Sequence, residues 1–152
     1  MTPDFRFDPK SVDWTRLQGG PEFDYPIDYE VAVMGYQEDA GTLGLLVRFA
    51  PKSYCHFHRH VAATTTLVLE GEQHVYDVGP GGDVTHKVRP AGTYAYSPGG
   101  DLHMECGGPD GATVFFGLQS PTGHLFDLLD KEHNVIGQNT IQNFAEMIAE
   151  LS

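Results

Sequence analysis

The sequence predicts an all-β protein that folds as one barrel or sandwich. Short apolar, β-branched segments recur about every 8–12 residues, and no helical pattern lies between them. Its 18 glycines and 10 prolines are spread along the 152 residues rather than gathered in one tract, as expected for many strands joined by turns. A chain of this length is sufficient for a single domain with one core.

The first strands are marked by changes in composition. Turn-forming residues occur every few positions over residues 1–28, so we expect an N-terminal arm or edge segment there. Strand-like sequence begins with Tyr29–Met34 and continues with Thr42–Phe49 after a glycine-containing turn. Ala50 and Pro51 then end the second strand.

Later strands are recognised by the same changes in composition, and a helix is expected at the end of the chain. Further β segments are predicted at 54–60, 64–70, 73–78, 84–88, 93–97, 102–106, 113–118, 125–129 and 135–136. After Thr140, which can cap a helix, apolar residues recur at helical spacing at Ile141, Phe144, Ile148 and Leu151. We therefore expect a barrel over 29–138 and a helix within 139–152 that packs on it.

Charge and composition argue against several classes of partner. The formal net charge of −12 disfavours nucleic acid and anionic membranes, and no apolar run is long enough to cross a bilayer. The N-terminus lacks the apolar stretch of a signal peptide, so we expect a cytoplasmic protein. In that reducing compartment a disulfide between Cys55 and Cys106 is not expected.

Three histidines at alternate positions indicate a metal site. On a strand His56, His58 and His60 all point to one face. The outer two are about 13 Å apart at a rise of roughly 3.3 Å per residue, which is too far to share one ion with bonds near 2 Å. Neighbours in the series can converge on an ion, so the pair is either His56 with His58 or His58 with His60.

A more distant segment resembles a known family. Gly92, Pro98, Gly100 and His103 match every fixed position of the second cupin motif, G-x5-P-x-G-x2-H. The first cupin motif is G-x5-H-x-H-x3-E-x6-G, and the chain matches it at His58, His60 and Gly71. The chain departs from it at two positions, with Lys52 in place of the first glycine and Thr64 in place of the glutamate. The resemblance implies a single-domain cupin, which is a double-stranded β-helix or jelly-roll barrel. It also implies one divalent metal held by His58, His60 and His103, with His56 outside the ligand set.

The missing glutamate shapes the expected chemistry. With Thr64 in its place, three neutral imidazoles would leave the full metal charge uncompensated and several coordination positions open, which favours catalysis and an anionic, bidentate oxygen ligand. Fe(II) suits this best, with Zn, Ni or Mn as alternatives, and no catalytic residue is expected beyond the metal ligands.

Residues predicted to surround the metal or line a pocket are Thr64, His56, Tyr96 and Phe116. Core packing is nevertheless the favoured role for the aromatic residues Tyr94, Tyr96, Phe115 and Phe116, and the other histidines, His74, His86, His124 and His133, are read as hydrogen-bonded or surface residues.

A second resemblance concerns the activity. From about Tyr29 to its end, the chain resembles the small three-histidine Fe(II) dioxygenases that cleave acetylacetone or 2,4′-dihydroxyacetophenone. This implies a small ketone substrate and O₂, and we expect a homodimer. The pattern LVRFAP, H-x-H and LVLEGE is also similar to anti-sigma-factor cupins, which retain a glutamate where Thr64 or Thr65 stands. A non-catalytic metal- or ligand-sensing module therefore stays open, as does a metal-dependent isomerase or lyase on the same site.

Overall fold

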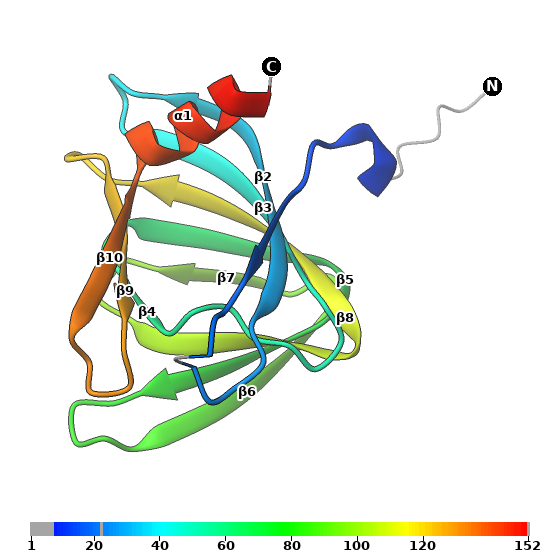
Figure 1. Ribbon diagram of the computed structural model, residues 1–152, viewed down its shortest axis with the longest axis vertical. Coiled ribbons are helices and arrows are strands. Elements are labelled where there is room, and N and C mark those ends of the chain that lie inside the picture. The colour runs from blue at the N-terminus through cyan, green and yellow to red at the C-terminus, as the bar shows by residue number, and fades with distance from the viewer. Residues whose placement is uncertain (1–7, 22, 152) are drawn as a thin grey trace.

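The computed structural model describes residues 8–21 and 23–151, and it contains a strongly curved antiparallel sheet with one C-terminal helix. A short 3-10 turn, Pro9–Ser11, precedes the sheet. The remaining elements are β1 (Thr15–Gln18), β2 (Asp28–Gln37), β3 (Thr42–Phe49), β4 (His58–His60), β5 (Ala63–Val78), β6 (Val84–Pro90), β7 (Tyr94–Ser97), β8 (Leu102–Gln119), β9 (His124–Leu129), β10 (Val135–Thr140) and α1 (Ile141–Leu151). The predicted cupin fold, a β-barrel followed by a helix, is confirmed (Figure 1).

Two long strands join the halves of the barrel. β5 has 16 residues and β8 has 18, and the two pair with each other along most of their length. The first part of β8 pairs with β4, whereas its last part pairs with β3. One strand therefore supplies side chains to both halves of the barrel.

Both long strands bend where they pass from one half of the barrel to the other. Gly71 of β5 lies at this bend with a φ of +70°, and the register against β8 shifts on both sides of it. A Cβ at this position would collide with the carbonyl oxygen of Gly111. Gly71 is thus required both by its backbone conformation and by the close approach of β8.

The core fills the barrel and extends to the helix. Buried side chains on β2, β3, β5 and β8 form one cluster, which Ile141 and Phe144 of α1 complete. Thr140 caps the helix: its hydroxyl accepts from the Asn143 amide at 3.1 Å, and the Asn143 side chain accepts from the Thr140 amide at 2.9 Å. The helix lies across one end of the barrel, near β2 and β10 (Figure 1).

The N-terminal segment, for which an arm or edge segment was expected, holds a strand, β1, that pairs with β2; residues 1–7 and 22 of that segment lie outside the described part. Several expected strand bounds are corrected. Strand β4 covers only His58–His60, and the separately predicted segments 64–70 with 73–78, and 102–106 with 113–118, are each one continuous strand.

The predicted core role is wrong for two of the aromatic residues. Tyr94 and Tyr96 are 66% and 63% exposed, because β7 turns them to the outside of the barrel. Phe116 is 5% exposed and belongs to the core. None of the helices in the described ranges has the length and apolar character needed to span a membrane.

Candidate metal centre

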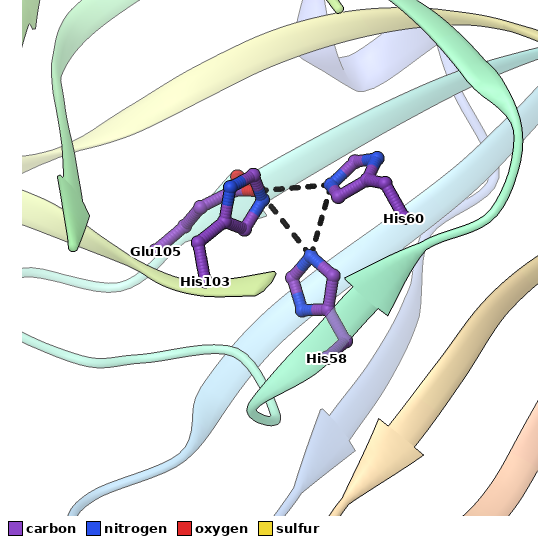
Figure 2. A group of neighbouring side chains, drawn as sticks. All are labelled: His58, His60, His103 and Glu105. Atoms are coloured by element: carbon purple, nitrogen blue, oxygen red, sulfur yellow. Dashed lines mark hydrogen bonds and ion pairs between the residues drawn. The ribbon is translucent and has the colours of Figure 1, made fainter. Parts of the chain in front are cut away.

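Four side chains from two neighbouring strands converge inside the barrel. His58 and His60 occupy alternate positions of β4 and are buried, while Arg59 between them is exposed. His103 and Glu105 occupy alternate positions of β8, and His58 pairs directly with His103 across the two strands. Because alternate residues of a strand share a face, both pairs point to the same place (Figure 2).

The four potential ligand atoms lie at distances that suit one divalent ion. His58 Nε2 and His60 Nε2 are 3.1 Å apart. The Oε1 atom of Glu105 is 3.5 Å from His58 Nε2, 3.6 Å from His60 Nε2 and 2.8 Å from His103 Nε2. Bonds of about 2.0–2.2 Å place adjacent ligands of one ion roughly 3–3.5 Å apart, so a group of four atoms lying within 4.8 Å of one another is compatible with a shared ion.

Hydrogen bonds fix the orientation of the two β4 imidazoles. The Nδ1 atom of His58 donates to the His56 carbonyl at 2.7 Å. His60 Nδ1 donates to the Thr64 hydroxyl at 3.0 Å, since that hydroxyl itself donates to the Ala62 carbonyl at 3.2 Å. With the proton on Nδ1, each ring presents the lone pair of Nε2 to the centre of the cluster, which is the arrangement that metal-binding histidines adopt.

The two β8 side chains are supported in the same way. His103 Nδ1 lies 3.2 Å from Asp77 Oδ1, and Lys87 holds the other oxygen of Asp77 at 2.8 Å. The fully buried Gln73 donates to Glu105 Oε2 at 2.8 Å. Each of the four side chains is therefore held by a specific partner, with Glu105 Oε1 left facing the imidazoles.

The electrostatics of the cluster depend on its burial. Burial by itself would raise the pKa of Glu105, but the three imidazoles hold it well below its usual range. Burial lowers the pKa of His60 to about 4, against the opposing effect of Glu105. Burial also acts to lower the pKa of His103, yet Asp77 and Glu105 together raise it to about 9. Metal-free, the cluster thus combines a carboxylate with at least one protonated imidazole.

Within the four-residue cluster, one buried side-chain atom makes no hydrogen bond. His103 Nε2 makes no hydrogen bond of acceptable geometry among the described residues, although Glu105 Oε1 is nearby. A buried nitrogen without such a bond is unfavourable unless something binds it, and a metal ion at the centre of the cluster would do so. Three imidazoles and one carboxylate also form a donor set that Fe(II), Zn, Mn and Ni accept. The residues present therefore fit a divalent metal.

The cluster in the structure agrees with the sequence-based prediction in its three histidines but differs from it in containing a carboxylate. The structure brings His58, His60 and His103 together as expected. The expectation that the site contains no carboxylate is wrong, because Glu105 takes part from β8 instead of from the position of Thr64. The signal was present, since His103 and Glu105 alternate in the same way as His58 and His60.

The predicted surrounding residues have different positions. Thr64 contacts the cluster directly through His60. His56 contacts it through its carbonyl group, and its ring bonds the Tyr29 hydroxyl at 2.9 Å. Phe116 faces the His60 ring at a centroid distance of 6.4 Å. Tyr96 is largely exposed and contributes to the lining of a polar cavity that also includes His60 and His103.

An apolar chamber adjoins the cluster inside the barrel. Its volume is about 220 Å³, and its walls include the side chains of His58, His60 and Glu105. The rest of the wall is mainly aliphatic and aromatic, with contributions from Val47, Phe49, Phe116, Phe126, Leu128, Phe144 and Met147. The last two come from α1, so the helix closes one side of the chamber. Such a chamber suits a small apolar molecule with one end at the cluster.

A second, polar cavity adjoins the cluster. It also measures about 220 Å³ and includes His60 and His103. Lys87, Arg89 and Asp77 give it a charged lining. The cluster therefore lies between an apolar chamber and a polar cavity.

Comparison with known proteins agrees with this fold. Residues 2–122 match the model of the ChrR cupin-like domain family. An RmlC-like cupin from Ralstonia eutropha has a similar structure, with a TM-score of 0.71 at 16% identity, covering 95% of this chain and 83% of its own. An acetylacetone dioxygenase from Acinetobacter johnsonii gives a TM-score of 0.70 at 12% identity, covering 100% and 95% of the two chains. At these identities the likeness concerns the fold, and no curated protein matches the sequence.

Proposed function

Because the chain belongs to the ChrR cupin-like family and buries a His₃Glu cluster beside an apolar chamber, we propose that it is a metal-dependent dioxygenase. In this proposal His58, His60, His103 and Glu105 hold one Fe(II) ion. With O₂, the enzyme cleaves a C–C bond next to a carbonyl in a small diketone or hydroxyaryl ketone. The observation that carries the proposal is the direct opening of the chamber onto three of the four side chains.

Charge at the site favours an anionic oxygen ligand. A divalent ion with one carboxylate keeps a net charge of about +1, which is lower than three neutral imidazoles alone would leave. An enolate, formed when a 1,3-diketone loses a proton, carries one negative charge and two oxygens. The ion supplies Lewis-acid and redox chemistry when bound.

The contribution of the protein chain is to position the substrate and exclude water. The aromatic and aliphatic walls around Phe49, Phe116 and Phe126 can hold the hydrocarbon part of a ketone, and α1 separates it from solvent. For a 1,3-diketone the overall reaction adds both atoms of O₂ and gives one carboxylic acid and one 2-oxoaldehyde. No other co-reactant is needed.

The similar structures support a cupin scaffold for such a reaction. The Acinetobacter johnsonii protein is an acetylacetone dioxygenase, and its fold covers this whole chain. At 12% identity this leaves the substrate to be decided by experiment.

Oxygen uptake tests the proposal. Metal-free protein is loaded anaerobically with Fe(II) and mixed with aerated acetylacetone or 2,4′-dihydroxyacetophenone, and O₂ consumption is measured with an electrode while products are identified by mass spectrometry. We expect one O₂ consumed per ketone cleaved, and loss of this activity in His103→Ala. His124→Ala is the matched control, because His124 lies outside the cluster and bonds Asp127. No O₂ uptake by the iron-loaded protein across a broad ketone panel would contradict the proposal.

A non-catalytic sensing module is the second candidate, and Glu105 is the observation that favours it. Four protein ligands can complete a tetrahedral zinc shell and leave no position for a substrate. Elemental analysis of protein purified without added metal distinguishes the two. Tightly held zinc with no turnover supports the sensor and iron supports the dioxygenase, while nickel or manganese with conversion that needs no O₂ indicates an isomerase or lyase.

A further inference from the structure

A second pair of histidines lies on the hairpin of β5 and β6. His74 belongs to β5 and is partly buried, and His86 belongs to β6 and is exposed. The two rings approach one another across the strands, with 2.8 Å between His74 Nδ1 and His86 Nε2. Strand β6 pairs with β5 and lies at an edge of the barrel, so solvent reaches this pair (Figure 1).

The sheet itself separates this pair from the metal cluster. Gln73, which precedes His74 in β5, is fully buried and donates to Glu105 of the cluster. Because consecutive side chains of a strand point to opposite faces, His74 points away from the cluster to the outside of the barrel. The pair is therefore a separate group of potential ligands.

A carboxylate fixes the orientation of the His74 ring. The Nε2 atom of His74 donates to Glu72 Oε1 at 2.8 Å, and Glu72 lies two residues earlier on the same face of β5. With its proton on Nε2, His74 presents the lone pair of Nδ1 to His86. A carboxylate that accepts from the far nitrogen of an imidazole is typical of metal-binding histidines.

Stacking fixes the second ring. His86 lies parallel to the ring of Tyr76, with a centroid distance of 4.4 Å and an interplanar angle of 5°. Tyr76 is also the residue that pairs with His86 in the β5–β6 ladder. Because His86 is exposed, its Nδ1 can carry the proton in contact with water while Nε2 receives an ion. One nitrogen of each ring is thus held at the same point of the surface.

The separation of the two nitrogens suits one metal ion. Ligands at right angles on an ion, with bonds of about 2.0–2.1 Å, lie roughly 2.8–3.0 Å apart. The observed 2.8 Å therefore allows His74 Nδ1 and His86 Nε2 to take neighbouring positions on a tetragonal or octahedral ion. In the metal-free protein a hydrogen bond joins the two nitrogens, and a bound ion would replace it.

The charge around the pair favours a cation. Glu72 places a carboxylate beside His74, and the whole chain carries a formal net charge of −12. Lys87, which follows His86, points to the other face of β6, where it binds Asp77. Two neutral imidazoles are ligands that Cu²⁺, Ni²⁺ and Zn²⁺ accept, and Cu²⁺ binds such sites most tightly.

We propose that His74 and His86 bind a second divalent transition-metal ion on the outside of the barrel, with Glu72 as a positioning residue. Two protein ligands leave the remaining coordination positions to water, so this ion is held less tightly than an ion in the four-residue cluster. The site is independent of the proposed dioxygenase activity, because the two groups of ligands lie on opposite faces of the sheet.

Retention on an immobilised metal tests the proposal, because an immobilised ion reaches only exposed ligands. Tag-free protein whose cluster is already loaded with Zn²⁺ is applied to a Cu²⁺ or Ni²⁺ resin and eluted with imidazole. We expect wild-type protein to be retained and His86→Ala to elute at a much lower imidazole concentration. His124→Ala is the matched control, since His124 is a partly exposed histidine that bonds a carboxylate, Asp127, and this variant should be retained like wild type.

Equilibrium dialysis with Zn²⁺ measures the number of ions bound per chain. Wild-type protein should bind two ions, one tightly and one in the micromolar range, whereas His74→Ala and His86→Ala should each bind one. Glu72→Gln should weaken the second ion by about 10- to 100-fold, the effect typical of losing a residue that orients a metal ligand. Circular dichroism establishes that each variant is folded.

Two results would overturn the proposal directly: a single ion per wild-type chain, or a second ion that binds only above about 1 mM. It would equally fail if wild-type protein passed through the resin, if His86→Ala kept two ions, or if His124→Ala eluted as early as His86→Ala. His103→Ala separates this result from the proposed function. That variant should lose the tightly bound ion and the oxygen uptake, yet keep the second ion and its retention on the resin.

Discussion

The two parts of strand β8 follow one backbone pattern but bury opposite kinds of side chain. In the first part, the inward positions carry His103 and Glu105, which are 7% and 2% exposed. In the last part, they carry Val114, Phe116 and Leu118, which are 0%, 5% and 2% exposed. Both parts alternate with period two and pair with strands on each side.

The first part of β8 buries polar ligand side chains at positions where apolar side chains would stabilise the barrel. Apolar inward residues stabilise the barrel by leaving water. An imidazole and a carboxylate at equivalent positions must be desolvated, and they need partners such as Asp77 and Gln73 to remain there. We therefore expect substitutions in the first part to affect metal binding and those in the last part to affect stability.

The largest expected effect is the loss of metal affinity in the variant Glu105→Gln. The amide keeps the shape of the side chain but lacks the negative charge that a divalent ion needs. Changing a residue that only supports a metal ligand typically costs 10- to 100-fold in affinity. We expect Glu105→Gln to cost more than this, on the order of 1,000-fold, or about 4 kcal/mol. Calorimetric titration with Zn²⁺ measures it, and an affinity within tenfold of wild type would exclude Glu105 as a ligand.

The converse substitution is Leu118→Ala in the last part of β8. Removal of this buried side chain leaves a cavity in the core, and we expect the free energy of unfolding to fall by about 2–5 kcal/mol. Denaturant titration of the metal-free protein measures the loss. Zn²⁺ affinity of the folded variant should stay unchanged, because Leu118 belongs to the apolar part of the strand. A large fall in affinity would mean that the two parts of β8 are not separable in this way.

Metal affinity should also depend on pH through His103. The pKa of this imidazole is raised to about 9 in the metal-free protein, whereas the ion binds only the neutral ring. Raising the pH removes the competing proton from His103, and also from His58, whose pKa is likewise raised to about 9, so affinity should increase by about tenfold per unit or more between roughly pH 6.5 and 8.5. In Asp77→Asn the pKa of His103 falls, and the increase should end at a lower pH. Identical pH profiles for the two proteins would contradict this account.

The sequence predicted the metal cluster better than its electrostatics. The fold and the convergence of His58, His60 and His103 follow from period-two and motif arguments, and the terminal helix follows from the helical spacing of apolar residues after Thr140. Glu105 was not predicted, because the first cupin motif has its glutamate at the position of Thr64. The alternation of His103 and Glu105 could have indicated it. The exposure of Tyr94 and Tyr96 was not predictable, since strand periodicity gives two faces without saying which one faces the core.

The smallest effect concerns the junction between the two parts of β8. Lys52 stands where the first cupin motif has glycine, and its φ is +56°. Its amide is held there, 3.2 Å from the carbonyl oxygens of both Gly107 and Gly108, where β8 passes between the halves of the barrel. A side chain in this left-handed conformation costs about 1–2 kcal/mol. Glycine removes this cost but adds about 0.4–1 kcal/mol of unfolded-state entropy.

We therefore expect Lys52→Gly to stabilise the protein by roughly 0.5–1 kcal/mol, which corresponds to a rise of a few degrees in Tm. Lys131→Gly is the matched control, because Lys131 is an exposed turn residue without a positive φ and should be destabilised by the same replacement. Thermal unfolding of the two metal-free variants gives the comparison. If both variants lost stability equally, the strain at Lys52 would be absent, and the junction would tolerate lysine because its backbone is not held in the left-handed region.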